Sequence, residues 1–252
     1  MEQPDFKAYG CQECAKGCDL DFEFSMAFQP IVNVENRTVY AQEALVRGIR
    51  GEGAAHIFQY VNANNRYRFD QSCRVKSIKL AAELGIESKL SINFLPNAIY
   101  KPELCIRTTL SAAERYGFDY KKIIFEFTED ERIQDHVHLI NIIQHYQELG
   151  FKTAIDDFGS GYNGLTLLGN MPTDIAKLDM ELIRNIDSDP TRQTVIRHTL
   201  AMFKEMNITV IAEGIETHEE YRCLRDLGVT LFQGFLFAKP AFEALAVIYW
   251  PE

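Results

Sequence analysis

The sequence lacks the features that mark membrane, secreted and nucleic-acid-binding proteins. No apolar run approaches the roughly 20 residues that a membrane-spanning helix needs. The opening MEQPDF is acidic where a secretory signal would be basic and then apolar. The formal charge is −10, so a broad phosphate-binding surface is not expected. We therefore expect a cytoplasmic protein that does not bind DNA or membranes directly.

The sequence also has no internal repeat, no low-complexity tract and no linker. Its 252 residues are 46% hydrophobic, which is enough for one substantial core at a size where α/β barrels form a single domain. A single barrel domain over residues 25–252 is therefore expected. Residues 1–24 are expected to form an N-terminal arm.

The arm carries three of the six cysteines in the segment CQECAKGC. Cys11, Cys14 and Cys18 have the CxxC spacing of a metal or redox site, but they lack a fourth thiol or a nearby histidine. A metal or redox role and a plain reduced arm are both open. The reduced arm is favoured because a structural zinc site usually has four ligands.

Short β-rich runs alternate with longer helical periods after residue 24, which indicates a mainly parallel sheet with crossover helices. Helices are expected over 69–85, 102–117 and 135–150. The expected strands are 26–32, 39–46, 89–94, 122–127, 151–156, 174–179, 208–213 and 229–234. The first two strands leave no room for a helix between them. The pattern predicts an α/β fold, a modified TIM (β/α)₈ barrel with an antiparallel first strand pair.

Most of these apolar runs end in a polar residue that can bind a metal or orient water. All parallel strands of a barrel point their C-terminal ends at one face, where active sites are built. Burying many carboxylates there costs several kcal/mol per ion unless cations pair with them. The residues at the strand ends are Glu43, Asn93, Glu126, Asp156, Asp157, Lys177, Glu213 and Gln233.

Oxygen ligands of this number suit Mg²⁺ or Mn²⁺, and no cysteine or histidine ends a strand to favour zinc. The segment AIDDFGSGYNG (154–164) offers two adjacent acids. We expect Asp156 to bridge two metals and Asp157 to hold only the second, which is an arrangement used for in-line displacement at phosphorus. The three glycines are expected to let the loop fold close over the metals.

Two other interpretations of the same segment are weaker. GSGYNG fits G-x-G-x-x-G, and Asp179 lies 20 residues after Gly159 as in a dinucleotide-binding fold. The adjacent acids would repel a pyrophosphate at that helix N-terminus. Asp157-Phe158-Gly159 spells a kinase triplet, but no VAIK lysine or HRD loop is present. His136 and His138 are two residues apart, so they face different sides of a helix and cannot chelate together.

Seven motifs, in order over roughly residues 26 to 240, closely resemble the EAL-domain cyclic di-GMP phosphodiesterases. They are QEALVRG, SINF, FEFTE, AIDDFGSGY, AKLD, VIAEGIET and FQGFLFAKP. The resemblance implies a barrel enzyme that hydrolyses cyclic di-GMP to linear pGpG with two Mg²⁺ or Mn²⁺ ions, and it implies a homodimer. An upstream sensor partner is a further expectation.

The resemblance also implies a role for each matching position. Lys177 would contact the attacking water, with Glu216 beside it and Gln233 fixing a metal-bound water. Glu129 would anchor the loop after Asp157 that couples dimerisation to metal binding. The first metal would be held by Glu43, Asn93, Glu126 and Asp156, the second by Asp156, Asp157 and Glu213, and the substrate by Gln29, Leu45 and Arg47.

Lys177 is expected to have a lowered pKa beside two cations, which suits proton transfer near neutral pH. A salt bridge to a neighbouring acid is the alternative for this lysine taken alone. The resemblance favours catalysis.

The sequence departs from the usual family pattern at three places. Arg47 is followed by Gly48 where the family more often has tryptophan, the asparagine motif continues as Phe94-Leu95-Pro96, and region 51–72 diverges. These departures concern base recognition and loop geometry more than the metal site. An active phosphodiesterase is favoured, and the alternative is a non-catalytic cyclic di-GMP receptor.

Overall fold

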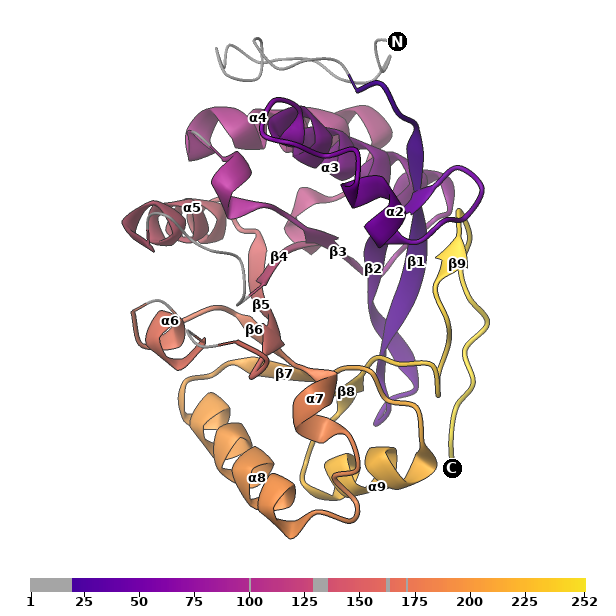
Figure 1. The fold of residues 1–252 in the computed structure, drawn as a ribbon, viewed down its shortest axis with the longest axis vertical. Coiled ribbons are helices and arrows are strands. Elements are labelled where there is room, and N and C mark those ends of the chain that lie inside the picture. Colours follow the sequence, from indigo (N-terminus) through magenta and orange to yellow (C-terminus); the bar gives the residue numbers. More distant parts are fainter. Residues whose placement is uncertain (1–19, 100, 129–135, 162–163, 171) are drawn as a thin grey trace.

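Eight strands close into a barrel in the computed structural model, which describes residues 20–99, 101–128, 136–161, 164–170 and 172–252 (Figure 1). The order around the ring is β2-β3-β4-β5-β6-β7-β8-β1, and β1 closes it on β2. Strand β1 is antiparallel to both of its ring neighbours, and the other neighbours are parallel. The predicted modified TIM barrel with an antiparallel first pair is confirmed. The strands are β1 (Phe24–Asn33), β2 (Thr38–Gly48), β3 (Lys89–Asn93), β4 (Ile123–Thr128), β5 (Lys152–Phe158), β6 (Ile175–Leu178), β7 (Thr209–Ala212) and β8 (Leu231–Phe232).

Helices surround the ring of strands (Figure 1). No helix among the described residues is both long and apolar enough to cross a bilayer. The α-helices are α2 (Ala54–Phe58), α3 (Arg66–Glu83), α4 (Pro102–Tyr116), α5 (His136–Glu148), α6 (Gly164–Asn170), α7 (Met180–Ile183), α8 (Pro190–Glu205) and α9 (His218–Asp226). Two 3₁₀ turns, η1 (Pro96–Ala98) and η2 (Tyr120–Lys122), precede α4 and β4.

Local sequence fixes where several helices begin and end. Helix α4 starts at Pro102, which needs no N–H partner, and ends at Gly117 with φ of 69°. The Asp189 side chain accepts the first free N–H groups of α8. Helix α9 begins with a capping box, in which Thr217 and Glu220 exchange side-chain and backbone bonds.

The barrel interior is filled by a small apolar cluster, distinct from the larger core that includes the residues under the helices. Side chains alternate along a strand, so residues two apart share a face. Each member of the cluster lies two positions along its strand from a polar residue described below. An apolar layer therefore forms the floor beneath the polar residues. Its members are Ile31, Ala41, Ile124, Ala154, Ile175, Ile211 and Leu231.

Some elements differ from the sequence-based expectations. A ninth strand, β9 (Ala241–Phe242), pairs with β1 and was not predicted. Strand β5 continues to Phe158, two residues beyond the predicted end, so both adjacent acids lie within it. Leu20 is buried in the core, and the Phe22 ring stacks on Tyr60 at 5.5 Å. The three arm cysteines lie outside the described residues.

Candidate active site

Lys177 lies at the centre of a group of carboxylates from four other strands or strand ends. This side chain on β6 is 1% exposed. Its Nζ is 2.6 Å from Glu213 Oε1, 2.9 Å from Asp156 Oδ1, 3.0 Å from Glu126 Oε2 and 3.5 Å from Glu43 Oε2. One ammonium group therefore faces four carboxylates.

Amide side chains surround Glu43 on the other side of the group. Gln233 Nε2 donates to Glu43 Oε2 at 2.6 Å, and Asn93 Nδ2 donates to Glu43 Oε1 at 3.0 Å. Gln233 Nε2 also lies 3.2 Å from Gln29 Oε1, and Gln29 in turn donates to the Ala238 carbonyl at 3.0 Å. The sequence-predicted strand-end residues are thus brought together in the barrel mouth.

Asp156 and Asp157 both reach the cluster because β5 has an irregular register next to β6 between Ile155 and Phe158. Adjacent residues of a regular strand point to opposite faces. Asp157 has φ of 53°, a left-handed conformation that aspartate tolerates better than most residues, and this interrupts the alternation. Oxygen atoms of Asp156, Asp157 and Glu213 consequently lie within 4.8 Å of one another.

Burial and mutual repulsion raise the pKa of several carboxyl groups. Burial, with the Glu43 and Asp156 charges, raises the pKa of Glu126 to about 8, although Lys177 acts to lower it. Burial raises the pKa of Asp157 to about 7, and Asp156 adds to this effect. The carboxylates are therefore crowded enough for neighbouring charges to oppose their ionisation.

Without metal ions, the pKa of Lys177 lies above its usual value, whereas the sequence-based expectation was a pKa lowered by two bound cations. Burial acts to lower this pKa, but the charges of Asp156, Glu126 and the other nearby carboxylates outweigh burial and hold it well above its usual value. The expected lowering depended on two cations beside the amine. The surrounding carboxylates alone have the reverse effect.

The cluster fits a pair of divalent cations. Glu43, Glu126 and Asp156 form one group of close oxygen atoms, and Asp156, Asp157 and Glu213 form a second. Asp156 belongs to both groups. If all five carboxyl groups are ionised, the positive charge of Lys177 neutralises one of them and the site has a net charge of −4. Two divalent cations would neutralise this charge. The Gln233 Oε1 atom is also buried without a hydrogen-bond partner. Carboxylate and amide oxygens are the ligands that Mg²⁺ and Mn²⁺ prefer.

The other sequence-predicted residues lie around this cluster. Leu45 and Arg47 follow Glu43 at two-residue steps on β2, so they continue its face toward the strand end. Arg47 Nη1 donates to the Val46 carbonyl at 2.7 Å. Glu216, predicted to lie beside Lys177, pairs with Arg184 at 3.3 Å. Glu129 lies outside the described residues.

Sequence reasoning missed a further partner of Glu126. Ser91 on β3 is fully buried and donates through its hydroxyl to Glu126 Oε1. Ser91 stands two residues before Asn93, inside the motif SINF. Its position on the face of Asn93 was the available signal, since a hydroxyl on the inner face of a barrel strand needs a partner.

The divergent region after β2 forms one wall of a pocket. An ideal Cβ on Gly48 would lie 2.2 Å from Glu52 Oε2, so Glu52 fills the space of a side chain at this position. The pocket has a volume of about 340 Å³. Its lining comes from segments that follow the C-terminal ends of β2 and β3 and includes Phe58, Asn62, Arg66, Leu95, Asn97 and Ala98.

Gly159 takes a left-handed conformation in the turn after β5. Its φ is 100°, and a Cβ there would lie 2.1 Å from Leu182 Cδ1 of α7. The glycine permits close packing of this turn against α7. Closure of the loop over metals stays a prediction.

The fold and the carboxylate cluster define a TIM-type barrel protein with a candidate metal centre at the C-terminal ends of its strands. A family model described as the EAL domain matches residues 17–240. The chain belongs to the EAL domain family, as the motif resemblance indicated.

Named relatives agree with this assignment. The blue light- and temperature-regulated antirepressor BluF of Escherichia coli K12 is 31% identical over 240 residues, 95% of this chain and 59% of BluF. The cyclic di-GMP phosphodiesterase PdeR of the same strain is 33% identical over 177 residues, 70% of this chain and 26% of PdeR. The chain thus spans well under two thirds of these curated relatives.

Solved structures are similar over most of the chain. A standalone versatile EAL protein from Vibrio cholerae O395, in its c-di-GMP-bound form, has a TM-score of 0.89 and 56% identity over 92% of this chain and 98% of that chain. Klebsiella pneumoniae BlrP1 in its manganese/cy-diGMP complex at pH 6 has a TM-score of 0.86 and 34% identity over 91% of this chain and 58% of that chain.

Proposed function

We propose that this protein is a metal-dependent phosphodiesterase that hydrolyses cyclic di-GMP to linear pGpG. One observation carries the proposal: two clusters of three acidic residues share Asp156 and lie around the buried Lys177. A site with five crowded carboxyl groups and one lysine is unsuited to an anionic substrate alone but suits a phosphodiester that arrives with cations. Family membership and relatives named as cyclic di-GMP phosphodiesterases support the substrate.

Each side chain has a proposed task in this reaction. The first ion would be held by Glu43, Asn93, Glu126 and Asp156, and the second by Asp156, Asp157 and Glu213. Such ions, Mg²⁺ or Mn²⁺, activate a water and neutralise charge on the phosphoryl group. Lys177 orients that water through its Nζ, and Gln233 fixes a second water through Oε1.

Substrate contact is proposed for residues nearer the mouth. Arg47 would bind a phosphate of cyclic di-GMP, since it extends the face of Glu43 toward the end of β2. Leu45 and Gln29 would contact the ligand from β2 and β1. Phe58 lines the pocket after β2 and would pack on a guanine base. It would thereby replace the tryptophan that the family more often has at the position of Gly48. Glu216 is proposed to act beside Lys177, and Glu129 is proposed to anchor the loop after Asp157.

A non-catalytic cyclic di-GMP receptor is the second candidate function. It is favoured by one observation, that a relative at 31% identity is named an antirepressor. The complete carboxylate set argues against it, because a receptor has no need of a buried site that is costly without metal. A homodimer and an upstream sensor partner stay predictions.

Chromatography of reaction products tests the proposal. The purified chain is incubated with cyclic di-GMP in the presence of Mg²⁺, Mn²⁺ or chelator, and Glu43→Gln serves as a variant with a defective site. Metal-dependent pGpG from the wild type alone is the expected result. Tight binding of cyclic di-GMP without turnover in either metal would support the receptor instead, and pGpG from Glu43→Gln at the wild-type rate would refute the assigned metal ligands.

A further inference from the structure

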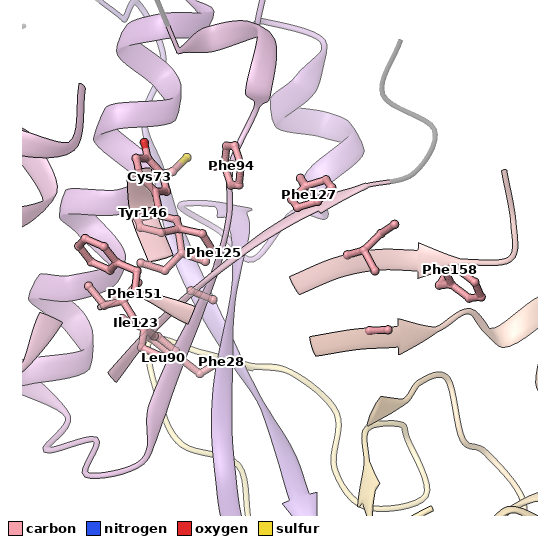
Figure 2. Packing of buried hydrophobic residues seen from close by; sticks show 14 of the residues in the cluster. Phe28, Cys73, Leu90, Phe94, Ile123, Phe125, Phe127, Tyr146, Phe151 and Phe158 are labelled. Atoms are coloured by element: carbon pink, nitrogen blue, oxygen red, sulfur yellow. The ribbon is translucent and has the colours of Figure 1, made fainter. Parts of the chain in front are cut away.

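A fully buried ion pair lies in α3, outside the carboxylate cluster. Arg74 is 0% exposed, and its Nη2 is 2.8 Å from Asp70 Oδ2 one helical turn away. Arg74 Nη1 donates to the Tyr146 hydroxyl of α5 at 3.1 Å. The guanidinium carbon is 5.6, 5.0 and 6.0 Å from the ring centroids of Phe94, Phe125 and Tyr146, the aromatic group that Figure 2 draws.

Stability alone is a poor reason for this pair. Removing two charges from water costs several kcal/mol per ion, and apolar residues of similar volume often give an equally stable or more stable protein. Burial raises the pKa of Asp70 even though Arg74 acts to lower it. Leucine and methionine would make the apolar contacts available at these two buried positions as well. The pair therefore calls for a role beyond packing.

The second carboxylate oxygen of Asp70 leads toward the candidate active site. Asp70 Oδ1 accepts a hydrogen bond from the Leu95 backbone N–H at 2.9 Å. Leu95 is the residue before η1, and its own side chain makes no capping hydrogen bond to that 3₁₀ turn. It follows Phe94, whose N–H bonds to the Glu126 carbonyl at 2.9 Å. The ion pair thus holds the chain two residues beyond Asn93.

We propose that Asp70, with Arg74 as its buried counter-charge, is a positioning residue that fixes the turn after β3 and so holds the Asn93 amide against Glu43. Arg74 restrains one oxygen of the Asp70 carboxylate while the other oxygen holds the Leu95 N–H. The rigid turn then limits rotation of Asn93, whose Nδ2 lies 3.0 Å from Glu43 Oε1. This inference depends on the proposed function, in which Asn93 and Glu43 hold the same ion. Partners of this kind typically change metal affinity by about 10- to 100-fold.

Two matched double variants separate positioning from packing. Asp70→Leu/Arg74→Met removes both charges and the acceptor for Leu95. Asp70→Asn/Arg74→Met removes both charges but keeps an oxygen that accepts from Leu95. Gln71 Nε2 lies 3.4 Å from Asp70 Oδ2, so a flip of the Gln71 amide would present its buried, unpartnered Oε1 to the new amide N–H. Asp70→Ala/Arg74→Met repeats the loss with a smaller side chain if the leucine variant fails to fold.

Mn²⁺ affinity, measured by titration of the folded proteins, is the primary measurement, and thermal melting with chelator is recorded beside it. The leucine variant should bind Mn²⁺ about tenfold more weakly than the asparagine variant, which should stay within about twofold of the wild type. The same pair of changes in an Asn93→Ala background should have no further effect on affinity, since the residue being positioned is gone.

The outcomes distinguish this inference from the proposed function. Equal Mn²⁺ affinity in the leucine and asparagine variants, or an undiminished effect in the Asn93→Ala background, would overturn the positioning role. Failure of the wild type to bind Mn²⁺ at all would overturn the metal site on which the inference rests.

Discussion

Replacing Lys177 by methionine should separate the structural and catalytic roles of this side chain. The change removes a cation that lies within 3.5 Å of four carboxylates. Removing one partner of a buried ion pair costs about 3–5 kcal/mol because the other charge is left uncompensated. In a domain of this size each kcal/mol shifts Tm by about 2–4 °C, so the metal-free variant should melt about 6–20 °C below the wild type.

Added Mn²⁺ should reverse the loss of stability but leave hydrolysis of cyclic di-GMP absent. Mn²⁺ ions give the carboxylates positive partners again, and the Lys177 ammonium group no longer competes with the ions for them. The Lys177 amine, which is proposed to orient the water, is still missing. Calorimetry with chelator and with Mn²⁺, and product chromatography, provide the two measurements.

Lys152→Met is the matched control. This lysine is half exposed and pairs with one carboxylate, Asp174, at 2.6 Å, so its loss should cost no more than about 1 kcal/mol. Equal melting temperatures of the two variants in chelator would refute the account of Lys177 as the counter-charge of the site. Hydrolysis restored to Lys177→Met by Mn²⁺ would refute its catalytic role.

Three further changes have defined outcomes. Burial acts to raise the pKa of Asp174, but its hydrogen bonds outweigh burial and lower it, so its stabilisation is present above the unfolded pKa and is lost as the pH falls through the lower folded value. Asp174→Asn should therefore cost about 1 kcal/mol in urea unfolding at pH 7, allowing for partial exposure, and the difference should shrink as the pH falls below the ordinary aspartate pKa of about 3.9. Gly234→Ala should lower both Tm and turnover, because its Cβ would lie 2.2 Å from the Ile215 carbonyl oxygen, whereas Gly53→Ala, with nothing within 4 Å, should change neither. Phe58→Ala should raise KM for cyclic di-GMP several-fold with kcat little changed, in steady-state kinetics; an unchanged KM would remove this ring from the substrate site.

The two-residue alternation of strands explains why much of the site could be predicted from the sequence. A polar residue at the end of an apolar run, such as Glu126 or Glu213, faces the same way as the apolar residue two positions earlier. Because parallel strands share one direction, these ends converge without any knowledge of loops. That reasoning found the eight residues around the mouth but carried no information on their pairwise contacts.

Features that break a local rule were not predictable in the same way. The irregularity in β5 that turns Asp157 toward Asp156 leaves no mark in an alternating pattern. Asp70 and Arg74 are spaced like an exposed helical ion pair, so their complete burial depends on neighbours from other elements. Glu216 lies in a loop, and its pairing with Arg184 follows from packing against α7. Strand β9 has two residues, which is too short for a periodic signal.

The reversed direction of β1 determines where the polypeptide enters the barrel. Phe24, the first residue of β1, pairs with Gly48, the last residue of β2. In a regular (β/α)₈ barrel the first strand would start at the opposite, floor side. Here the chain arrives at the rim of the barrel mouth that holds the carboxylate cluster, and Phe22 lies against Tyr60 of the divergent region. The described chain therefore begins on the side of the barrel that holds the carboxylate cluster, next to the divergent region that borders the pocket.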